Sequence, residues 1–108
     1  SRSDDVITTS GYRVGPTEVE ECLTGHPAVA MAGVIGVPDP VRTEVIRAYV
    51  VLAPGADVAG LEAALIDRVR TRLSPHLAPK AVETIDALPM TATGKIMRRE
   101  LKRRALAG

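Results

Sequence analysis

Aromatic residues are almost absent from this chain of 108 residues, which has no Phe and no Trp and only two tyrosines, Tyr12 and Tyr49. Its core must therefore be built from Val, Leu, Ile and Ala. Hydrophobic residues nevertheless make up 45% of the sequence and charged residues 25%, which is typical of a folded domain and argues against disorder. The length predicts a single domain with a modest core.

Cysteine is also scarce. Cys22 is the single cysteine, so an intrachain disulfide is excluded, and we expect a reducing, cytoplasmic compartment. No apolar run approaches the roughly 20 residues of a membrane-spanning helix, and no signal peptide is recognisable, so no membrane partner is expected. The chain opens on "SRSDD" without a starting Met, and we expect it to be a piece of a longer protein.

The spacing of apolar and turn-forming residues predicts five β-strands. Two short runs flank Ser10-Gly11 and predict a small N-terminal hairpin. Two longer runs are joined by the turn "PDPVRT" and predict a second hairpin, and a further strand follows later in the chain. The predicted strands span residues 6–9, 12–14, 28–37, 44–52 and 80–88.

Three helices are predicted between these strands. Pro16 suits the first turn of a helix that Gly25 ends, and apolar residues at spacings of 3 and 4 predict a second helix over 59–73. A third helix is expected from Ile96 onward, with Met97, Leu101 and Ala105 as its apolar stripe. Together these elements predict an α+β fold, a small mixed sheet flanked by helices and preceded by a short N-terminal β-hairpin.

The segment "LPMTATGKIMRRELKRR" (88–104) raises the question of whether Lys95 is a reactive group or only the first charge of a basic tail. A phosphate-binding P-loop is excluded, because Pro89 and Ile96 stand where that motif needs Gly and Ser or Thr. Nucleic-acid binding is disfavoured, because no aromatic stacking residue follows Tyr49. A metal site is disfavoured too, because Cys22 and the two histidines lack ligand spacing.

Three segments resemble one family. "RSDDVITTSGYRVGPTEVE" (2–20), "HPAVAMAGVIGVPDPVRTEVIRAYVVL" (26–52) and "LPMTATGKIMRREL" (88–101) are similar to the small C-terminal domain of adenylate-forming enzymes, specifically the acyl-CoA synthetases. One departure lies at Thr43, where the family often has glycine. The resemblance implies an acid-thiol ligase that converts a carboxylate, ATP (with Mg²⁺) and CoA into acyl-CoA, AMP and pyrophosphate. It also implies a larger N-terminal domain as partner, without which this piece should be inactive.

The resemblance also implies roles for single residues. Lys95 matches the catalytic lysine of adenylation, which contacts the carboxylate and the α-phosphate. Asp4 matches the hinge about which the domain turns between the two steps. The remaining matches are Ser10, Gly11 and Tyr12 for the loop that lines the CoA pantetheine channel, and Arg2 and Arg13 for contacts with the nucleotide and its phosphate.

Two further interpretations stay open. The first is the small domain of a carrier-protein-dependent adenylation module, although "SGYRVGPTEVE" (10–20) is more similar to the CoA ligases. The second is a protein-interaction module, because "PMTATGK" (89–95) fits the pattern around a lysine that Gcn5-type acetyltransferases modify in CoA synthetases. Acetylation of Lys95 would remove its charge, and a sirtuin-type deacylase would restore it.

Overall fold

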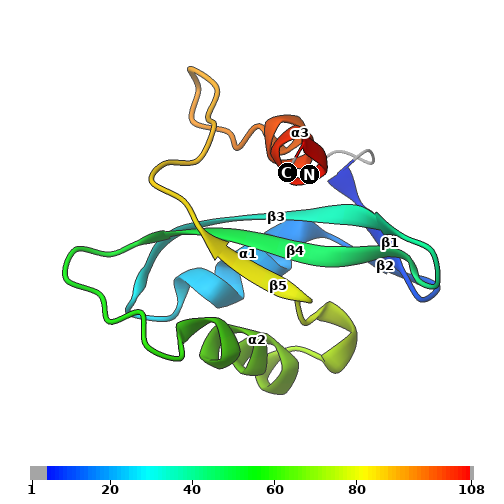
Figure 1. Cartoon of the computed structure of the whole chain (residues 1–108), viewed down its shortest axis with the longest axis horizontal. Coiled ribbons are helices and arrows are strands. Elements are labelled where there is room, and N and C mark those ends of the chain that lie inside the picture. The colour runs from blue at the N-terminus through cyan, green and yellow to red at the C-terminus, as the bar shows by residue number, and fades with distance from the viewer. Residues whose placement is uncertain (1–4, 108) are drawn as a thin grey trace.

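A computed structural model describes residues 5–107 of the chain (Figure 1). The strands are β1 (Ile7–Thr9), β2 (Tyr12–Val14), β3 (Val29–Asp39), β4 (Thr43–Leu52) and β5 (Ala81–Thr84). The helices are α1 (Pro16–Thr24), α2 (Leu61–Arg72) and α3 (Arg98–Ala107), with a short 3-10 helix, η2, at Pro75–Leu77. The α+β class and the N-terminal hairpin predicted from the sequence are confirmed.

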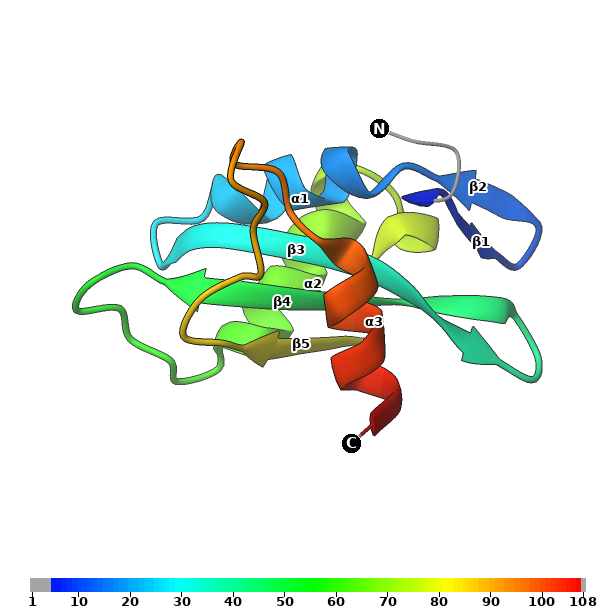
Figure 2. The ribbon, with the colours of Figure 1, turned by 90° about the horizontal axis from the view of Figure 1, so that it is seen from above.

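The sheet is mixed. Strands β3 and β4 form a long antiparallel hairpin, and β3 is the outer strand on one side. The other side of β4 pairs with β1 near its start, through Thr9 and Thr43, and with β5 further along. Strand β5 runs parallel to β4, which requires the crossover through α2. The sheet therefore leaves the β1–β2 hairpin projecting at one end (Figure 2).

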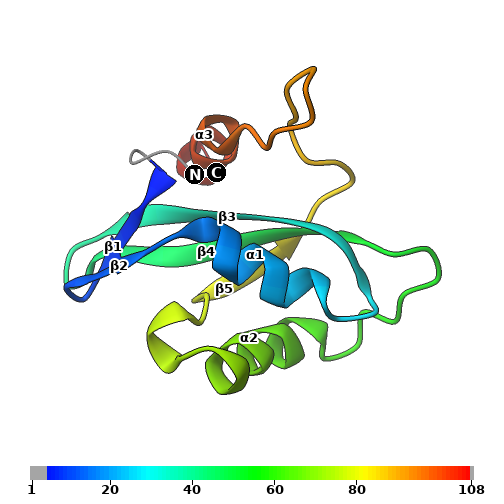
Figure 3. The ribbon, with the colours of Figure 1, turned by 180° about the vertical axis from the view of Figure 1, so that it is seen from behind.

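Helices cover both faces of the sheet. Helices α1 and α2 lie on one face and α3 lies alone on the other (Figures 1 and 3). Successive strand residues face opposite sides, so Val34 and Ala48 join the core under α1 and α2, whereas Ile35 and Tyr49 join a second core with Leu101 of α3. The sheet is thus buried on both faces, which explains its almost continuous apolar strands.

Glycine on β3 lets α3 lie close to the sheet. A Cβ placed on Gly33 would stand 2.8 Å from Cδ1 of Leu101 and 3.2 Å from Cδ2 of Leu88. A larger residue would force the side chains of Leu101 and Leu88 to repack. Gly33 therefore lets these two side chains lie close against the sheet.

Two boundaries differ from the sequence prediction. The strand expected at 80–88 is only Ala81–Thr84, because the chain bends after pairing with β4 and carries Leu88 into the core beneath α3. The last helix begins at Arg98 rather than near Ile96, because Ile96 pairs with Met90 instead. Met97 therefore lies outside the helix and is 38% exposed, whereas Leu101 is 1% exposed. The predicted stripe is wrong at Met97.

Within residues 5–107, no helix has the length and apolar character needed to cross a membrane.

Candidate functional site

Lys95 lies on a closed turn between β5 and α3. The N–H of Thr91 donates to the carbonyl of Lys95 (2.8 Å), and the N–H of Gly94 donates to the carbonyl of Thr91 (3.0 Å). The hydroxyl of Thr91 also accepts a hydrogen bond from the N–H of Lys95 (3.0 Å). Gly94 has φ of +85°, a left-handed conformation that glycine adopts without steric cost. The sequence "TATGK" therefore folds into a defined turn that presents one lysine.

Further bonds join the two sides of the loop that carries this turn. Met90 and Ile96 form an isolated antiparallel bridge, and the N–H of Met97 donates to the carbonyl of Pro89 (2.8 Å). The turn stands clear of the sheet beside α3 (Figures 1 and 3). Lys95 itself is exposed, and it lines a groove of about 710 Å³ between the turn, the start of α3 and residues of α1. A lysine in this position is available to a ligand held by another domain.

A partly buried ion network lies at the base of the same groove. The Nε of Arg98 donates to Oε2 of Glu20 (3.1 Å), and its Nη2 donates to Oε1 (2.7 Å). A third nitrogen, Nη1, donates to Oδ2 of Asp5 (3.2 Å). Burial disfavours the charged guanidinium, but the hydrogen bonds and charges of Glu20 and Asp5 outweigh it, and the pKa of Arg98 is raised above its ordinary value. The arginine is therefore held as a cation inside the domain.

The second candidate element is the β1–β2 hairpin. Ser10 and Gly11 form its two-residue turn, with φ of +51° and +84°. Positive φ at both turn residues is the geometry that suits the right-handed twist of a hairpin. A Cβ on Gly11 would meet nothing within 4 Å, so the backbone there is open to an approaching ligand. Tyr12 follows the turn, 47% exposed, and its ring stacks on His76.

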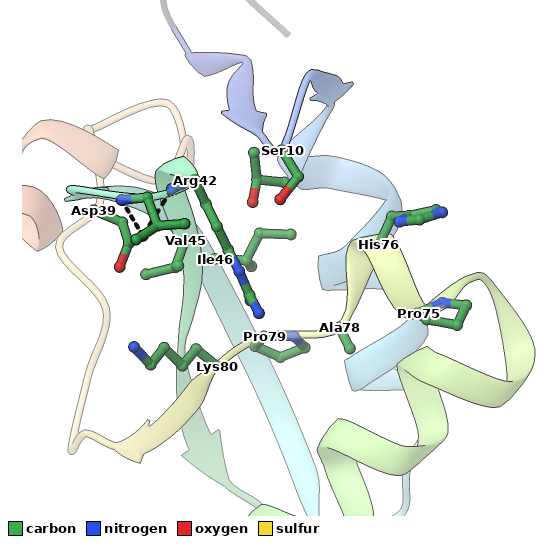
Figure 4. A pocket seen from close by; sticks show the side chains of 12 residues that line it. Ser10, Asp39, Arg42, Val45, Ile46, Pro75, His76, Ala78, Pro79 and Lys80 are labelled. Atoms are coloured by element: carbon green, nitrogen blue, oxygen red, sulfur yellow. Dashed lines mark hydrogen bonds between the residues drawn. The ribbon is translucent and has the colours of Figure 1, made fainter.

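A pocket of about 690 Å³ adjoins this hairpin (Figure 4). Ser10 contributes from the hairpin, Arg42 from the β3–β4 turn, and His76 and Lys80 from the segment after α2. Figure 4 shows the Arg42 side chain reaching across the pocket toward Pro79. Two cationic side chains beside a serine hydroxyl favour an anionic ligand such as a phosphate group.

Asp39 closes the turn that carries Arg42. Its Oδ2 accepts hydrogen bonds from the N–H groups of Val41 (3.0 Å) and Arg42 (2.8 Å), which Figure 4 draws as dashed lines. These bonds from Arg42 and Val41 lower the pKa of Asp39. Asp39 therefore stays ionised near neutral pH and offsets one of the two cations, so Arg42, Lys80 and Asp39 together carry a net charge of one positive unit.

The predicted site residues fall into two groups. Lys95 belongs to the loop between β5 and α3, and Ser10, Gly11 and Tyr12 belong to the β1–β2 hairpin, which lies at the far end of the domain from that loop (Figure 1). Arg13 is exposed on β2 opposite Thr8 and does not line the pocket beside the hairpin. Arg2 and Asp4 lie outside the described residues.

Sequence reasoning missed several residues. Arg42 falls in a predicted connecting turn and Lys80 at the start of a predicted strand, and no local pattern distinguishes them from surface charges. Glu20 has a visible signal, because it falls on the helix face of Pro16, Val19 and Leu23, which is the buried face of α1. Its acidic character by itself indicates only a contribution to the helix dipole. Arg98 reads in the sequence only as part of the basic tail.

Among residues 5–107, no group of three or more His, Cys, Asp or Glu side chains is arranged to hold a metal ion.

Comparison with known proteins identifies the family. The sequence profile of the family described as "AMP-binding enzyme C-terminal domain" matches residues 18–95. The chain is 50% identical over 104 residues to 4-hydroxybutyrate–CoA ligase 1 of Metallosphaera sedula, and 53% identical over 102 residues to the acetyl-coenzyme A synthetase of Bacillus subtilis. These matches cover 95% and 94% of this chain but only 18% of each relative.

Comparison of the fold with solved structures identifies the same family. The crystal structure of an acyl-CoA synthetase from Brucella canis superposes with a TM-score of 0.92 and 46% identity, over 99% of this chain and 20% of that one. The chain therefore spans about one fifth of the length of the proteins it matches. It belongs to the family of AMP-binding enzyme C-terminal domains, and its relatives in sequence and structure are acyl-CoA synthetases.

Proposed function

We propose that this chain is the mobile C-terminal domain of an AMP-forming acyl-CoA synthetase. In the first step of that reaction, a carboxylate oxygen attacks the α-phosphorus of ATP, the bond to the β-phosphate breaks, and acyl-adenylate and pyrophosphate form. In the second step, the CoA thiol loses its proton and attacks the acyl carbonyl, and AMP leaves with the oxygen that joined it to the acyl group. The balance is carboxylate, ATP and CoA to acyl-CoA, AMP and pyrophosphate.

One observation carries this proposal: the Lys95 turn and the Ser10–Tyr12 loop lie at opposite ends of the domain (Figures 1 and 3). If both ends serve one binding site on a larger domain, the domain presents one end in each step. Rotation about a hinge at Asp4 would allow this.

Lys95 serves the first step. Lys95 closes a hydrogen-bonded turn and is exposed, so its ammonium can reach a phosphate held by the larger domain and stabilise the charge that develops on the transferred group. The turn restricts the backbone and leaves the four-carbon side chain free to adjust. A lysine presented in this way acts as a compact positive charge.

The hairpin and its pocket serve the second step. Ser10, Gly11 and Tyr12 line the path of the pantetheine arm, and the open backbone at Gly11 admits it. The phosphate groups at the nucleotide end of CoA then lie in the pocket lined by Arg42 and Lys80. This assignment gives the cationic pocket a ligand of the opposite charge, directly beside the predicted channel.

The test is Lys95→Ala in the full-length enzyme, with the two half-reactions assayed separately. ATP–pyrophosphate exchange should fall by about 10²–10³-fold, the typical loss for one preorganised charge contact. Thioester formation from supplied acyl-adenylate should persist. Lys102→Ala on α3 is the matched control and should leave both rates unchanged. Normal exchange in the Lys95 variant would show that Lys95 is only one charge of the basic tail. Exchange by the 108-residue piece alone would refute its assignment as a C-terminal domain that needs a larger partner.

We further propose that acetylation of Lys95 regulates the first step. Lys95 is exposed on a projecting turn, so an acetyltransferase of the Gcn5 type can reach its ammonium, and a sirtuin-type deacylase can reach the product. Acetyl-Lys95 has no positive charge and should reproduce the adenylation defect of Lys95→Ala. Mass spectrometry after incubation with such an acetyltransferase should find the modification on Lys95. An acetylated enzyme with normal adenylation would exclude this mode of control.

A further inference from the structure

Arg98 joins three parts of the chain that are distant in sequence. It lies in the first turn of α3, and its guanidinium binds Glu20 of α1 through two hydrogen bonds and Asp5 through a third. Its side chain is 14% exposed and that of Glu20 is 9% exposed, so water screens this pair weakly. A planar guanidinium that meets both carboxylate oxygens also fixes the orientation of the two groups.

The positions of these residues relate the network to both parts of the proposed mechanism. Arg98 lies three residues after Lys95, directly beyond the turn that presents the lysine. Asp5 directly follows Asp4, the predicted hinge, in the sequence. Glu20 also accepts the N–H of Val34 on β3 (2.8 Å), which ties α1 to the sheet at the same carboxylate. The start of α3 is thus connected to the hinge-proximal residue and to the centre of the domain.

We propose that Arg98 is a positioning residue for adenylation: together with Glu20 and Asp5 it fixes the Lys95 turn relative to the hinge. Rotation about the hinge then carries the lysine to a defined place. This inference rests on the proposed roles of Lys95 and Asp4. Arg98 acts through Lys95 and touches neither ATP nor the carboxylate.

The contacts that hold α3 show what the Arg98–Glu20–Asp5 network, here called the clamp, adds to the packing of the helix. Leu101 is the residue of α3 that is fully buried, and its apolar contact holds the first turn against the sheet, whereas Arg98 supplies the hydrogen bonds that join the same end of the helix to α1. Displacement of a catalytic group by about 1 Å can lower a rate by about 10²-fold. The bidentate contact of Arg98 restrains the helix at the end nearest Lys95.

The first test is Arg98→Lys in the full-length enzyme, which keeps the charge but cannot bind both oxygens of Glu20 as a fork. We expect kcat for adenylation to fall by about 10-fold to 10²-fold, with KM for ATP nearly unchanged, because ATP is bound by the larger domain. Thioester formation from supplied acyl-adenylate should stay within about threefold of wild type. The matched control is Arg103→Lys on the same helix, where the ion pair with Glu100 is exposed.

A second test separates positioning from folding. If Arg98 acts only through Lys95, Arg98→Lys should cause no additional loss of adenylation when Lys95 is already alanine. A residue that merely stabilises the fold would lower the rate by the same factor in both backgrounds. Asp5→Asn weakens the contact between Arg98 and Asp5 and leaves the Arg98–Glu20 pair intact. This variant should therefore fold and still lower adenylation selectively.

The outcomes distinguish this inference from the proposed function. Selective loss of adenylation in Arg98→Lys and Asp5→Asn, absent in the Lys95→Ala background, supports the clamp. Equal loss of both half-reactions in Arg98→Lys overturns the positioning role of Arg98 and leaves the role of Lys95 intact. Normal adenylation in Arg98→Lys, when Lys95→Ala has lost adenylation, has the same consequence. Normal adenylation in Lys95→Ala overturns both.

Discussion

The ring of Tyr12 stacks on the imidazole of His76, with 3.9 Å between ring centroids and 21° between the ring planes. This contact joins the end of the β1–β2 hairpin to the segment after α2, two regions that lie 64 positions apart in the chain. His76 lines the cationic pocket, so the stack holds one wall of that pocket against the predicted pantetheine loop. Aromatic pairs of this kind contribute about 0.5–1.5 kcal/mol beyond the area that they bury.

The stack predicts a selective effect of Tyr12→Ala. Thioester formation should fall by up to about tenfold, the rate equivalent of the stacking energy, whereas ATP–pyrophosphate exchange should be unaffected. Tyr12→Phe keeps the ring and should behave as wild type. Measured half-reactions of both variants check this, and an equal loss of the two rates in Tyr12→Ala would show that the ring has only a structural role.

Gly11→Leu should obstruct the second step and spare the first. The structure offers a matched control, because Gly55 also has a positive φ (+76°), and a Cβ added there would likewise meet no atom within 4 Å. Both substitutions should therefore lower the free energy of unfolding by about 1–2 kcal/mol through backbone strain. Urea unfolding measures that shared cost. Only Gly11→Leu should lower thioester formation, and the same loss in Gly55→Leu would attribute the effect to strain.

Thr43→Gly should stabilise the domain. Thr43 has φ of +74°, where a side chain with a branched Cβ is strained, and no side-chain hydrogen bond of Thr43 offsets that strain within the described residues. Relief of about 1–2 kcal/mol of strain exceeds the entropic cost of glycine, so we expect a net gain of about 0.5–1 kcal/mol. Thr84→Gly, in an ordinary strand, should destabilise. Urea midpoints of the two variants should move in opposite directions.

The Asp39 turn should lose stability in acid. The pKa of Asp39 is lowered in the folded state by the N–H groups of Arg42 and Val41, so the folded form favours the carboxylate. This contribution is fully present above the ordinary pKa of 3.8 and is lost as the pH falls through the lower folded value. Asp39→Asn can still accept a backbone hydrogen bond but does not titrate. Its difference in urea midpoint from wild type should therefore change across this acidic range and stay constant near neutrality.

Most of the fold could be predicted, because its signals are local. The β-branched runs of β3 and β4, the proline that begins α1 and the spacing of Leu61, Leu65 and Val69 each depend on neighbours in the sequence. The sequence predicts a mixed sheet, but the pairing of β5 with β4 in particular could not be predicted, because it depends on where α2 returns the chain. Strand β5 also ends earlier than predicted, at Thr84, because its length depends on the same pairing with β4.

The candidate site divides in the same way. Lys95 and the Ser10–Gly11 turn could be found because each lies in a recognisable local motif. Arg98 and Arg42 could not be found, because the role proposed for each depends on residues that only folding brings close to it. Glu20 is the intermediate case: its place on the apolar face of α1 is visible in the sequence, but its partner 78 positions away is not.

The bond from the N–H of Val34 to Glu20 has a consequence for association of the domain. Strand β3 is the outer strand of the sheet, and its outward N–H groups form an edge to which a strand of another molecule can add. Glu20 occupies one of these donors near the middle of β3, and Arg98 binds both oxygens of the same carboxylate. A strand that approaches the middle of this edge therefore meets an occupied donor and an ion pair in its path, which disfavours edge-to-edge pairing at that point.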